Sequence, residues 1–231
     1  MELWTTQIGD LVTSDFRIAS LFQEAGLDFC CGGRMTLQEA CEKKGISLVS
    51  ICEKIEKLKM SEPDSSKNFK EWDLGFMCDY IVNTHHKYVL KTLPELLFYT
   101  EKIASVHGGR HSELVEIATL FSEINRELSQ HLKNEEEVLF PAIKDIIKGK
   151  SAASAGIIIN EIARMTAEHE FAGGAMDRIN EMTDNYSVPD DGCNTYSVAF
   201  RTLKQFEDDL HIHVHLENNI LYPGALKIAN Q

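Results

Sequence analysis

The chain has 231 residues and a formal net charge of −13 at pH 7, with 43% hydrophobic and 26% charged residues. This size allows one large domain, or a medium-sized domain with a small appendage. The acidic chain has no basic patch, which argues against nucleic acid or an anionic membrane as the main partner. No basic segment followed by an apolar run opens the chain, so no secretory signal is expected, and no apolar stretch is long enough to cross a membrane. Six cysteines in such a chain favour reduced thiols and a cytoplasmic location.

Residues 1–60 are predicted to form a small domain of short helices. Thr36 and Glu39 fit a capping box at the start of one helix, and residues 48–58 carry apolar side chains at helical spacing. Before the capping box stands the segment Asp-Phe-Cys-Cys-Gly-Gly, at residues 28–33. A unit of this size is near the lower limit for independent folding, so we expect it to lean on a neighbour.

Residues 61–70 are polar and predict a linker, and residues 71–231 form the second domain. Strand signals are nearly absent, so the predicted fold class is all-α. Long helices with short connections favour an antiparallel, up-down-up-down four-helix bundle. The four helical patterns span roughly residues 73–105, 110–148, 152–186 and 194–227.

One motif occurs twice in the second domain. Residues 131–141 read His-Leu-Lys-Asn-Glu-Glu-Glu-Val-Leu-Phe-Pro, and residues 213–223 read His-Val-His-Leu-Glu-Asn-Asn-Ile-Leu-Tyr-Pro. Both follow the pattern H-x3-E-x3-L-[FY]-P. A histidine and a glutamate four residues apart share one face of a helix, and the proline after them is expected to kink it. Two copies in one chain indicate two halves of one site.

Apolar residues at spacings of three and four form a core-facing seam in each of the last three patterns. Polar residues stand near the middle of every seam, where a histidine or glutamate is costly unless something binds it. The seams are Ile117, Phe121, Ile124, Leu128, His131, Glu135 and Val138; Ile158, Ile162, Met165, His169, Ala172, Met176 and Ile179; and Leu203, Phe206, Leu210, His213, Glu217 and Ile220.

The histidines complete an internal repeat in which each half supplies one lone histidine and then one His-x3-Glu pair. This arrangement suits two metal ions that share bridging carboxylates and keep open positions for water or a diatomic molecule. Nitrogen and oxygen ligands without thiolate favour iron, with manganese second and zinc third. The predicted ligands are His86, His131, Glu135, His169, His213 and Glu217.

Several neighbouring side chains leave alternatives open. His86 aligns better with the apolar residues of its helix than His85, but either could be the ligand. His211 and His215 are rotated away from His213 and are expected on the surface or behind the ligands. A lone core histidine is more often a hydrogen-bonded structural residue than a ligand, so a structural role is the alternative for His169.

Four glutamates lie beside the predicted ligands. Glu127 is one turn before His131 and Glu168 is adjacent to His169, so each could hydrogen-bond a ligand, move protons near the metals, or be an ordinary surface residue. Glu136 and Glu137 are expected on a solvated face.

The Cys-Cys-Gly-Gly segment, followed by a bundle with these histidine and His-x3-Glu positions, resembles the repair-of-iron-centres family over nearly the whole chain. These di-iron proteins are linked to the repair of iron–sulfur clusters after nitrosative or oxidative stress. The resemblance implies a hemerythrin-like bundle, the same six ligands, and Glu127 and Glu168 as groups that hydrogen-bond near the two iron ions. It also implies damaged iron–sulfur proteins as clients.

Cys30 and Cys31 are adjacent thiols, which can close only a strained ring, so any disulfide between them should be easily reduced. They could bind metal transiently, react with nitric oxide or dock a damaged cluster, or be small buried thiols in a tight turn. The resemblance favours the functional roles. The other four cysteines are expected to be core or incidental residues.

Iron donation to damaged clusters is the predicted function. The alternatives are an enzyme that reduces nitric oxide at the two irons, a sensor or store that binds oxygen or nitric oxide, and a metal-free structural bundle. A homodimer is a further expectation, because the small first unit could pack on a partner.

Overall fold

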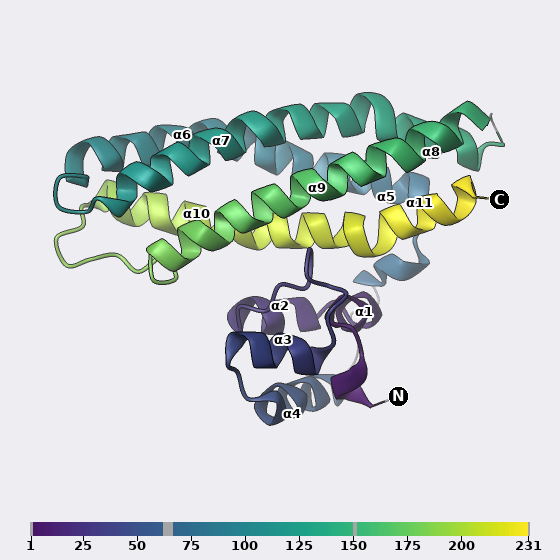
Figure 1. Ribbon diagram of the computed structural model, residues 1–231, viewed down its shortest axis with the longest axis horizontal. Coiled ribbons are helices and arrows are strands. Elements are labelled where there is room, and N and C mark those ends of the chain that lie inside the picture. Colours follow the sequence, from purple (N-terminus) through teal and green to yellow (C-terminus); the bar gives the residue numbers. More distant parts are fainter. Residues whose placement is uncertain (1, 62–66, 150–151, 231) are drawn as a thin grey trace.

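The computed structural model describes residues 2–61, 67–149 and 152–230. Within these ranges the chain contains no β-strand, and an isolated antiparallel bridge joins Gln7 to Thr36. A long helical bundle lies against a smaller N-terminal unit (Figure 1). The all-α prediction, with a small helical domain and a bundle, is confirmed.

The N-terminal unit consists of a 3₁₀ turn, η1 (Leu3–Thr5), and four helices: α1 (Ile8–Ser14), α2 (Ile18–Glu24), α3 (Leu37–Lys44) and α4 (Leu48–Lys59). The predicted capping box starts α3. The Thr36 side chain accepts a hydrogen bond from the Glu39 amide at 3.2 Å, and a Glu39 carboxylate oxygen accepts one from the Thr36 amide at 2.8 Å. Apolar side chains of all four helices form the unit's own core.

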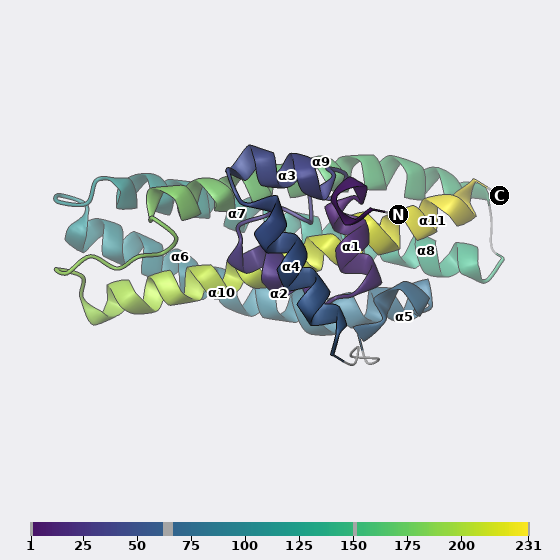
Figure 2. The ribbon, with the colours of Figure 1, turned by 90° about the horizontal axis from the view of Figure 1, so that it is seen from below.

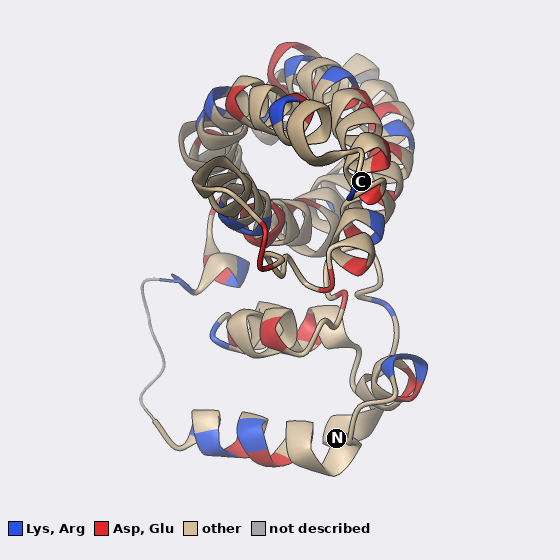
Figure 3. Ribbon diagram, turned by 90° about the vertical axis from the view of Figure 1, so that its left-hand side faces the viewer, with Lys and Arg blue, Asp and Glu red and all other residues tan. Residues whose placement is uncertain are grey.

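Four long helices form the bundle, and three of them are interrupted by one π-helical turn each. In chain order the segments are α5 (Leu74–Ile81), η4 (Val82–His86) and α6 (Lys87–His107); α7 (Glu113–Asn134), η5 (Glu135–Leu139) and α8 (Phe140–Ile147); α9 (Ala152–Met182); and α10 (Asn194–Leu216), η6 (Glu217–Leu221) and α11 (Tyr222–Ala229). The helix α6 packs on α7 and α10, and α9 packs on the same two helices. The end-on view shows this ring (Figure 3).

The predicted linker leads into the bundle through a 3₁₀ turn, η3 (Phe69–Glu71). Residues 62–66 of that linker lie outside the described part of the chain. Phe69 is buried and packs edge-on against Trp72 and Phe16. The last residues of the predicted linker therefore pack with the bundle, next to the N-terminal unit.

Two apolar clusters fill the bundle, one at each end, and a polar layer separates them. Along α7 and η5 the cluster that includes Leu128 gives way to His131 and Glu135, and the second cluster begins at Leu139. The same order is found along α10 and η6, where Leu210 precedes the buried polar residues and Leu221 follows them. Apolar packing on both sides keeps this polar layer in place and away from water.

The three π turns all lie at this polar layer. In a π turn an amide bonds to the carbonyl five residues earlier, as the Phe140 amide does to the Glu135 carbonyl. The extra residue rotates the side chains that follow. The prediction that Val138 continues the core seam was wrong for this reason: Val138 is 39% exposed, and Leu139 is buried instead. Pro141 lies in the first turn of α8, where its missing N–H group is tolerated.

The N-terminal unit lies across α9 and α10 near the middle of the bundle (Figure 2). The Asn219 side-chain amide donates to the carbonyls of Phe29 and Cys30 at 3.3 and 3.2 Å, and Gln23 donates to the Asp208 carbonyl at 2.7 Å. A Cβ atom at Gly33 would stand 2.7 Å from the Asn219 side-chain oxygen, so this approach requires glycine.

Docking of this unit buries His215, which was expected either on the surface or behind the ligands. His215 is 0% exposed because the ring of Phe29 covers it at a centroid distance of 5.4 Å. The unit therefore packs on the bundle of its own chain, which removes the reason given for a homodimer. Among the described residues, no helix is long and apolar enough to span a membrane.

Candidate metal centre

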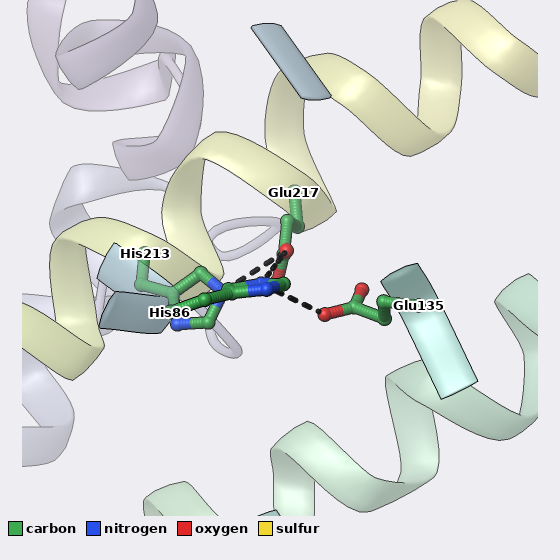
Figure 4. A group of neighbouring side chains, drawn as sticks. All are labelled: His86, Glu135, His213 and Glu217. Atoms are coloured by element: carbon green, nitrogen blue, oxygen red, sulfur yellow. Dashed lines mark hydrogen bonds and ion pairs between the residues drawn. The ribbon is translucent and has the colours of Figure 1, made fainter. Parts of the chain in front are cut away.

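All six predicted ligands meet in the polar layer, each 0 to 1% exposed. His86 arrives from η4, His169 from α9, and the two His-x3-Glu pairs from the α7–η5 and α10–η6 junctions. Figure 4 shows four of these side chains pointing toward one another. The Nε2 atoms contact carboxylate oxygens: His86 and His131 approach Glu135 at 3.3 and 3.2 Å, and His169 and His213 approach Glu217 at 3.2 and 3.0 Å.

The six residues form two overlapping groups, each compact enough to surround one cation. One group contains His86 and His213, the other contains His131 and His169, and both contain Glu135 and Glu217. Within each group the ligand atoms lie within 4.8 Å of one another. Because both carboxylates belong to both groups, the arrangement suits two cations bridged by Glu135 and Glu217.

The hydrogen bonding of these residues also fits a cation. The Nε2 atoms of His131 and His169 face each other at 3.1 Å, where the lone pairs of two imidazoles would repel unless a proton or metal lay between them. His86 Nε2 and one carboxylate oxygen each of Glu135 and Glu217 are buried, and their close approaches do not have hydrogen-bond geometry. Buried polar atoms normally make hydrogen bonds, so this arrangement points to an ion.

Three of the four histidines have Nδ1 held by a side chain outside the group of six. Such a contact fixes the ring and leaves Nε2 free to bind a metal, as in many metal sites. The contacts are Glu136 with His86 at 2.8 Å, Glu168 with His131 at 2.8 Å, and Asn218 with His169 at 3.0 Å.

Glu136 was expected on a solvated face, and this was only half right. Its side chain is 38% exposed, yet one oxygen holds His86. Asn218 performs the same task for His169 in the other half of the repeat. Each of these residues directly follows one of the two shared glutamates, at the start of a π turn. The position after the His-x3-Glu pair was therefore the sequence signal that could have identified both.

Glu168 and Glu127, the two glutamates expected near the ligands, are placed differently. Glu168 joins His131 to Arg164, whose guanidinium lies 2.8 Å from the second carboxylate oxygen. Glu127 is paired with Arg126 at 2.7 Å on the outside of α7. The structure thus brings Glu168, but not Glu127, into hydrogen-bond contact with the six residues.

His85 occupies the position in the first half that Glu168 occupies in the second, immediately before the lone histidine. Its ring stacks on His213 at 5.5 Å with an interplanar angle of 7°, and its Nδ1 lies 3.0 Å from Asp209. It therefore faces away from the two glutamates, whereas His86 faces them. This placement favours His86 as the ligand and makes His85 a neighbour of His213.

The aromatic residue of each repeated motif packs against the lone histidine of its own half. Phe140 stacks on His86 at 5.6 Å, and Tyr222 stacks on His169 at 5.8 Å. The two aromatic side chains differ by the hydroxyl of Tyr222, which donates a hydrogen bond to Glu135 at 2.6 Å. Burial, together with the Glu135 and Glu217 charges, raises the pKa of Tyr222, so the hydroxyl keeps its proton.

Replacing Tyr222 with phenylalanine is expected to weaken metal binding at least about tenfold, because a hydrogen bond to a buried carboxylate contributes about 1.5 kcal/mol or more. The other half already carries phenylalanine at this position, so the fold should tolerate the change. Competition with a chelator measures the effect, and Tyr99→Phe, away from the six residues, is the control. Equal affinities of both variants would show that the hydrogen bond does not hold the carboxylate for a metal.

In the metal-free protein, two protons would take the place of the cations. Burial opposes protonation of His86 and His131, but the carboxylates of Glu135 and Glu217 outweigh it and raise the pKa of both imidazoles to about 10. Despite its burial and the nearby Glu217 charge, the same histidines lower the pKa of Glu135 to about 2. Burial lowers the pKa of His213, which stays neutral. Two imidazolium ions thus balance two carboxylates.

This charge balance predicts how the stability of the metal-free protein depends on pH. A raised histidine pKa stabilises the fold below pH 6.5, the ordinary value, and this stabilisation is lost as the pH rises towards 10. The melting temperature of the chelator-treated protein should therefore fall across this interval. The metal-loaded protein should not show the fall, since cations replace the protons. Parallel melting curves of the two forms would contradict the assignment.

The Cys30-Cys31 segment lies on the bundle directly over this layer. Cys31 Sγ is 3.6 Å from the His169 carbonyl and 3.9 Å from Cys30 Sγ, and both thiols are free. Asp28 accepts hydrogen bonds from the amides of Cys30, Cys31 and Gly32 and lies 3.1 Å from Cys30 Sγ.

Cys30 and Cys31 differ in environment. Cys30 is buried among the apolar residues of the bundle, and the neighbouring Cys31 thiol, together with burial, raises its pKa. Cys31 is half-buried and lines a pocket of about 280 Å³ with Asp28, Lys43 and Glu170. Asp28, Cys30 and Cys31 offer three ligand atoms within 4.8 Å of one another.

Comparison with known proteins agrees with this geometry. Residues 79–225 match the family model of the hemerythrin HHE cation binding domain, and residues 5–59 match ScdA_N, described as a domain of unknown function (DUF542). The chain is 36% identical to a protein of Musicola paradisiaca named iron-sulfur cluster repair protein YtfE, covering 95% of this chain and 96% of that protein. A protein of the same name from Yersinia pseudotuberculosis serotype O:1b is 33% identical, covering 98% of this chain and 99% of the relative.

These matches span both domains, and the polar layer provides groups of histidines and glutamates that could hold a cation. The resemblance predicted from the Cys-Cys-Gly-Gly segment and the paired motifs is thereby confirmed. The chain belongs to the repair-of-iron-centres family, in which a small N-terminal helical domain precedes a hemerythrin-like bundle.

Proposed function

We propose that this protein repairs iron–sulfur clusters damaged by nitrosative or oxidative stress, and that it does so by donating iron. The observation that carries the proposal is the pair of four-residue groups that share Glu135 and Glu217. One iron ion would be held by His86 and His213, the second by His131 and His169, with both carboxylates as bridges. The relatives named as iron–sulfur cluster repair proteins support damaged iron–sulfur proteins as clients.

The ligand set is suited to an ion that has to leave again. Imidazole and carboxylate bind iron less tightly than thiolate does, and a proton can replace iron at His86 and His131, whose pKa is about 10 without metal. Loading therefore releases protons, and unloading takes them up. The released ion leaves behind a neutral set of two imidazolium and two carboxylate groups rather than bare buried charges.

A client cannot reach the ligands directly, because they are 0 to 1% exposed. The Cys30-Cys31 segment lies against the bundle at this layer. Cys31 contacts the backbone of the ligand His169, and the Asp28, Cys30 and Cys31 side chains offer a set of three ligand atoms. We propose that this trio receives the iron and passes it to the client, with deprotonation of a thiol as the ion arrives. Six free thiols support a reducing, cytoplasmic location.

Nitric oxide reduction at the two ions is the alternative, and the burial of the ligands is compatible with it, since a diatomic molecule is far smaller than a protein client. Nitrous oxide formed over many turnovers would favour this enzyme, whereas a stoichiometric trace would count against it. The docked Cys30-Cys31 segment argues against a protein that only binds oxygen or nitric oxide, because such binding does not require it.

The experiment uses a dehydratase whose iron–sulfur cluster has lost iron. The iron-loaded protein should restore its activity under anaerobic conditions, and Glu135→Leu should not. Glu137→Leu is the matched control, because Glu137 stands on the same π turn and is exposed. Equal restoration by all three proteins would overturn the proposal.

A further inference from the structure

A cysteine and a histidine meet at the end of the bundle away from the N-terminal unit, where α6 ends and α10 begins (Figure 1). His107 Nε2 lies 3.2 Å from Cys193 Sγ. Cys193 is exposed, whereas His107 is only 6% exposed and its Nδ1 has no hydrogen-bond partner. The thiol is therefore the polar group toward which this buried imidazole points.

Both residues stand at helix ends that favour charge separation between them. Cys193 is the N-cap of α10, a helix of 23 residues, and has extended backbone angles of φ −81° and ψ 172°. His107 is the last residue of α6, a helix of 21 residues. A helix N-terminus stabilises an anion and a C-terminus stabilises a cation, so both dipoles favour transfer of the thiol proton to Nε2.

Charged residues near this pair contact one another. Asp191, the nearest carboxylate in the chain before Cys193, is 2.9 Å from His111 and 3.4 Å from Arg110. Glu113, at the start of α7, approaches the other nitrogen of His111 at 3.2 Å. Tyr196 of α10 packs its ring edge-on against His107.

These contacts give Cys193 an acidity that differs from that of Cys41, Cys52 and Cys78. The hydrogen bond from His107 and the amides of Tyr196 and Thr195 lower the pKa of Cys193 to about 7. Burial raises the pKa of Cys41, Cys52 and Cys78. The expectation that Cys193 is an incidental residue is therefore not supported by its surroundings.

We propose that Cys193 is a nucleophilic thiolate that exchanges with the disulfides of low-molecular-weight thiols, and that His107 is its positioning residue. The thiolate attacks one sulfur of the small disulfide, a Cys193–sulfur bond forms, and the original sulfur–sulfur bond breaks. The departing thiolate takes the proton from His107. The oxidising equivalents of the small disulfide remain in the new mixed disulfide, so no further oxidant is needed.

The mixed disulfide should persist, because the side chain that contacts Cys193 is a histidine and not a second cysteine. Cys30 and Cys31, whose thiols lie 3.9 Å apart, belong to the N-terminal unit near the middle of the bundle (Figure 2). The modification would therefore mark the protein under disulfide stress without using the six metal ligands.

The test exposes the full-length, metal-loaded protein to glutathione disulfide and locates the adduct by peptide mass spectrometry. Cys193 should be modified first, with a rate that rises to half its maximum near pH 7, and Cys193→Ser should remove this adduct. His107→Gln should slow the reaction at pH 7 about tenfold and move the midpoint upward by about one unit or more. Helix content and metal content should be unchanged.

Earlier modification of another cysteine, or a wild-type midpoint near that of an ordinary thiol, would overturn the proposal without any variant. An unchanged profile in a folded His107→Gln protein would remove the positioning role of His107. Cys52→Ser, which alters a half-buried thiol in α4, is the control and should leave the Cys193 rate as it is.

Discussion

Replacing Glu217 with glutamine should leave the protein unable to hold two metal ions. Glu217 belongs to both ligand groups, and its oxygens lie 3.2 Å from His169 and 3.0 Å from His213. An amide has nearly the shape of a carboxylate but no charge, so both cations lose a bridging anion. We expect at most one ion per chain and affinity reduced roughly a hundredfold or more. Metal analysis after anaerobic loading and desalting measures this loss.

The matched variant is Glu137→Gln, which removes one exposed charge from a neighbouring π turn and should keep the full metal content. Glu135→Gln should resemble Glu217→Gln, since Glu135 is shared in the same way. Two ions retained by both variants would show that the two carboxylates are not needed to hold the ions, and would remove their assignment as shared ligands.

Replacing Cys31 with serine should slow iron transfer to a client without changing iron binding. Cys31 is not among the six ligands, so the iron content is expected to remain at the wild-type level. Transfer to a damaged client should slow about tenfold or more, because serine retains the shape of the side chain but binds iron far more weakly than thiolate does. The rate at which client activity returns is the measurement.

Cys52→Ser is the control for this comparison. Cys52 is a half-buried thiol in α4, a helix of the N-terminal unit that does not carry Cys31. It should leave both iron content and transfer unchanged. If Cys31→Ser transferred iron at the wild-type rate, the Cys30-Cys31 segment would be a docking element and not a carrier.

The grouping was predictable because five of the six residues stood in one of three apolar seams, and the internal repeat added His86. A buried histidine or glutamate is so costly that three such seams with polar centres had to meet, and the structure brings all six together. The repeat of His-x3-Glu also indicated the two-fold character of the site. The choice between His85 and His86 was not decided by periodicity, since both are buried.

The π turns could not be predicted, and they decide what holds the ligands. A spacing of three and four residues carried the seam through Val138, whereas the wider turn moves that residue outward and places Glu136 against His86. The equivalent turn in the other half places Asn218 against His169. Helical periodicity assumes a constant rotation per residue, so it fails at the position where the site is built.

Docking of the N-terminal unit on the bundle could also not be predicted from the sequence. Asn219 and His215 look like ordinary residues on the outer face of a helix, and only the folded chain shows that Asn219 binds the Phe29 and Cys30 carbonyls. Contacts between segments nearly two hundred residues apart leave no periodic signal. The result is that Cys31 stands against the backbone of His169, a connection that neither motif suggested alone.

Iron transfer itself is the measurement that tests the central claim most directly. The protein would be loaded with isotopically labelled iron, mixed anaerobically with a dehydratase whose cluster has lost iron, and separated from it after activity returns. We predict labelled iron in the cluster of the reactivated client, in proportion to the activity regained, and a matching loss from the donor. Activity that returned while the label stayed in the donor, or no return of activity at all, would contradict iron donation.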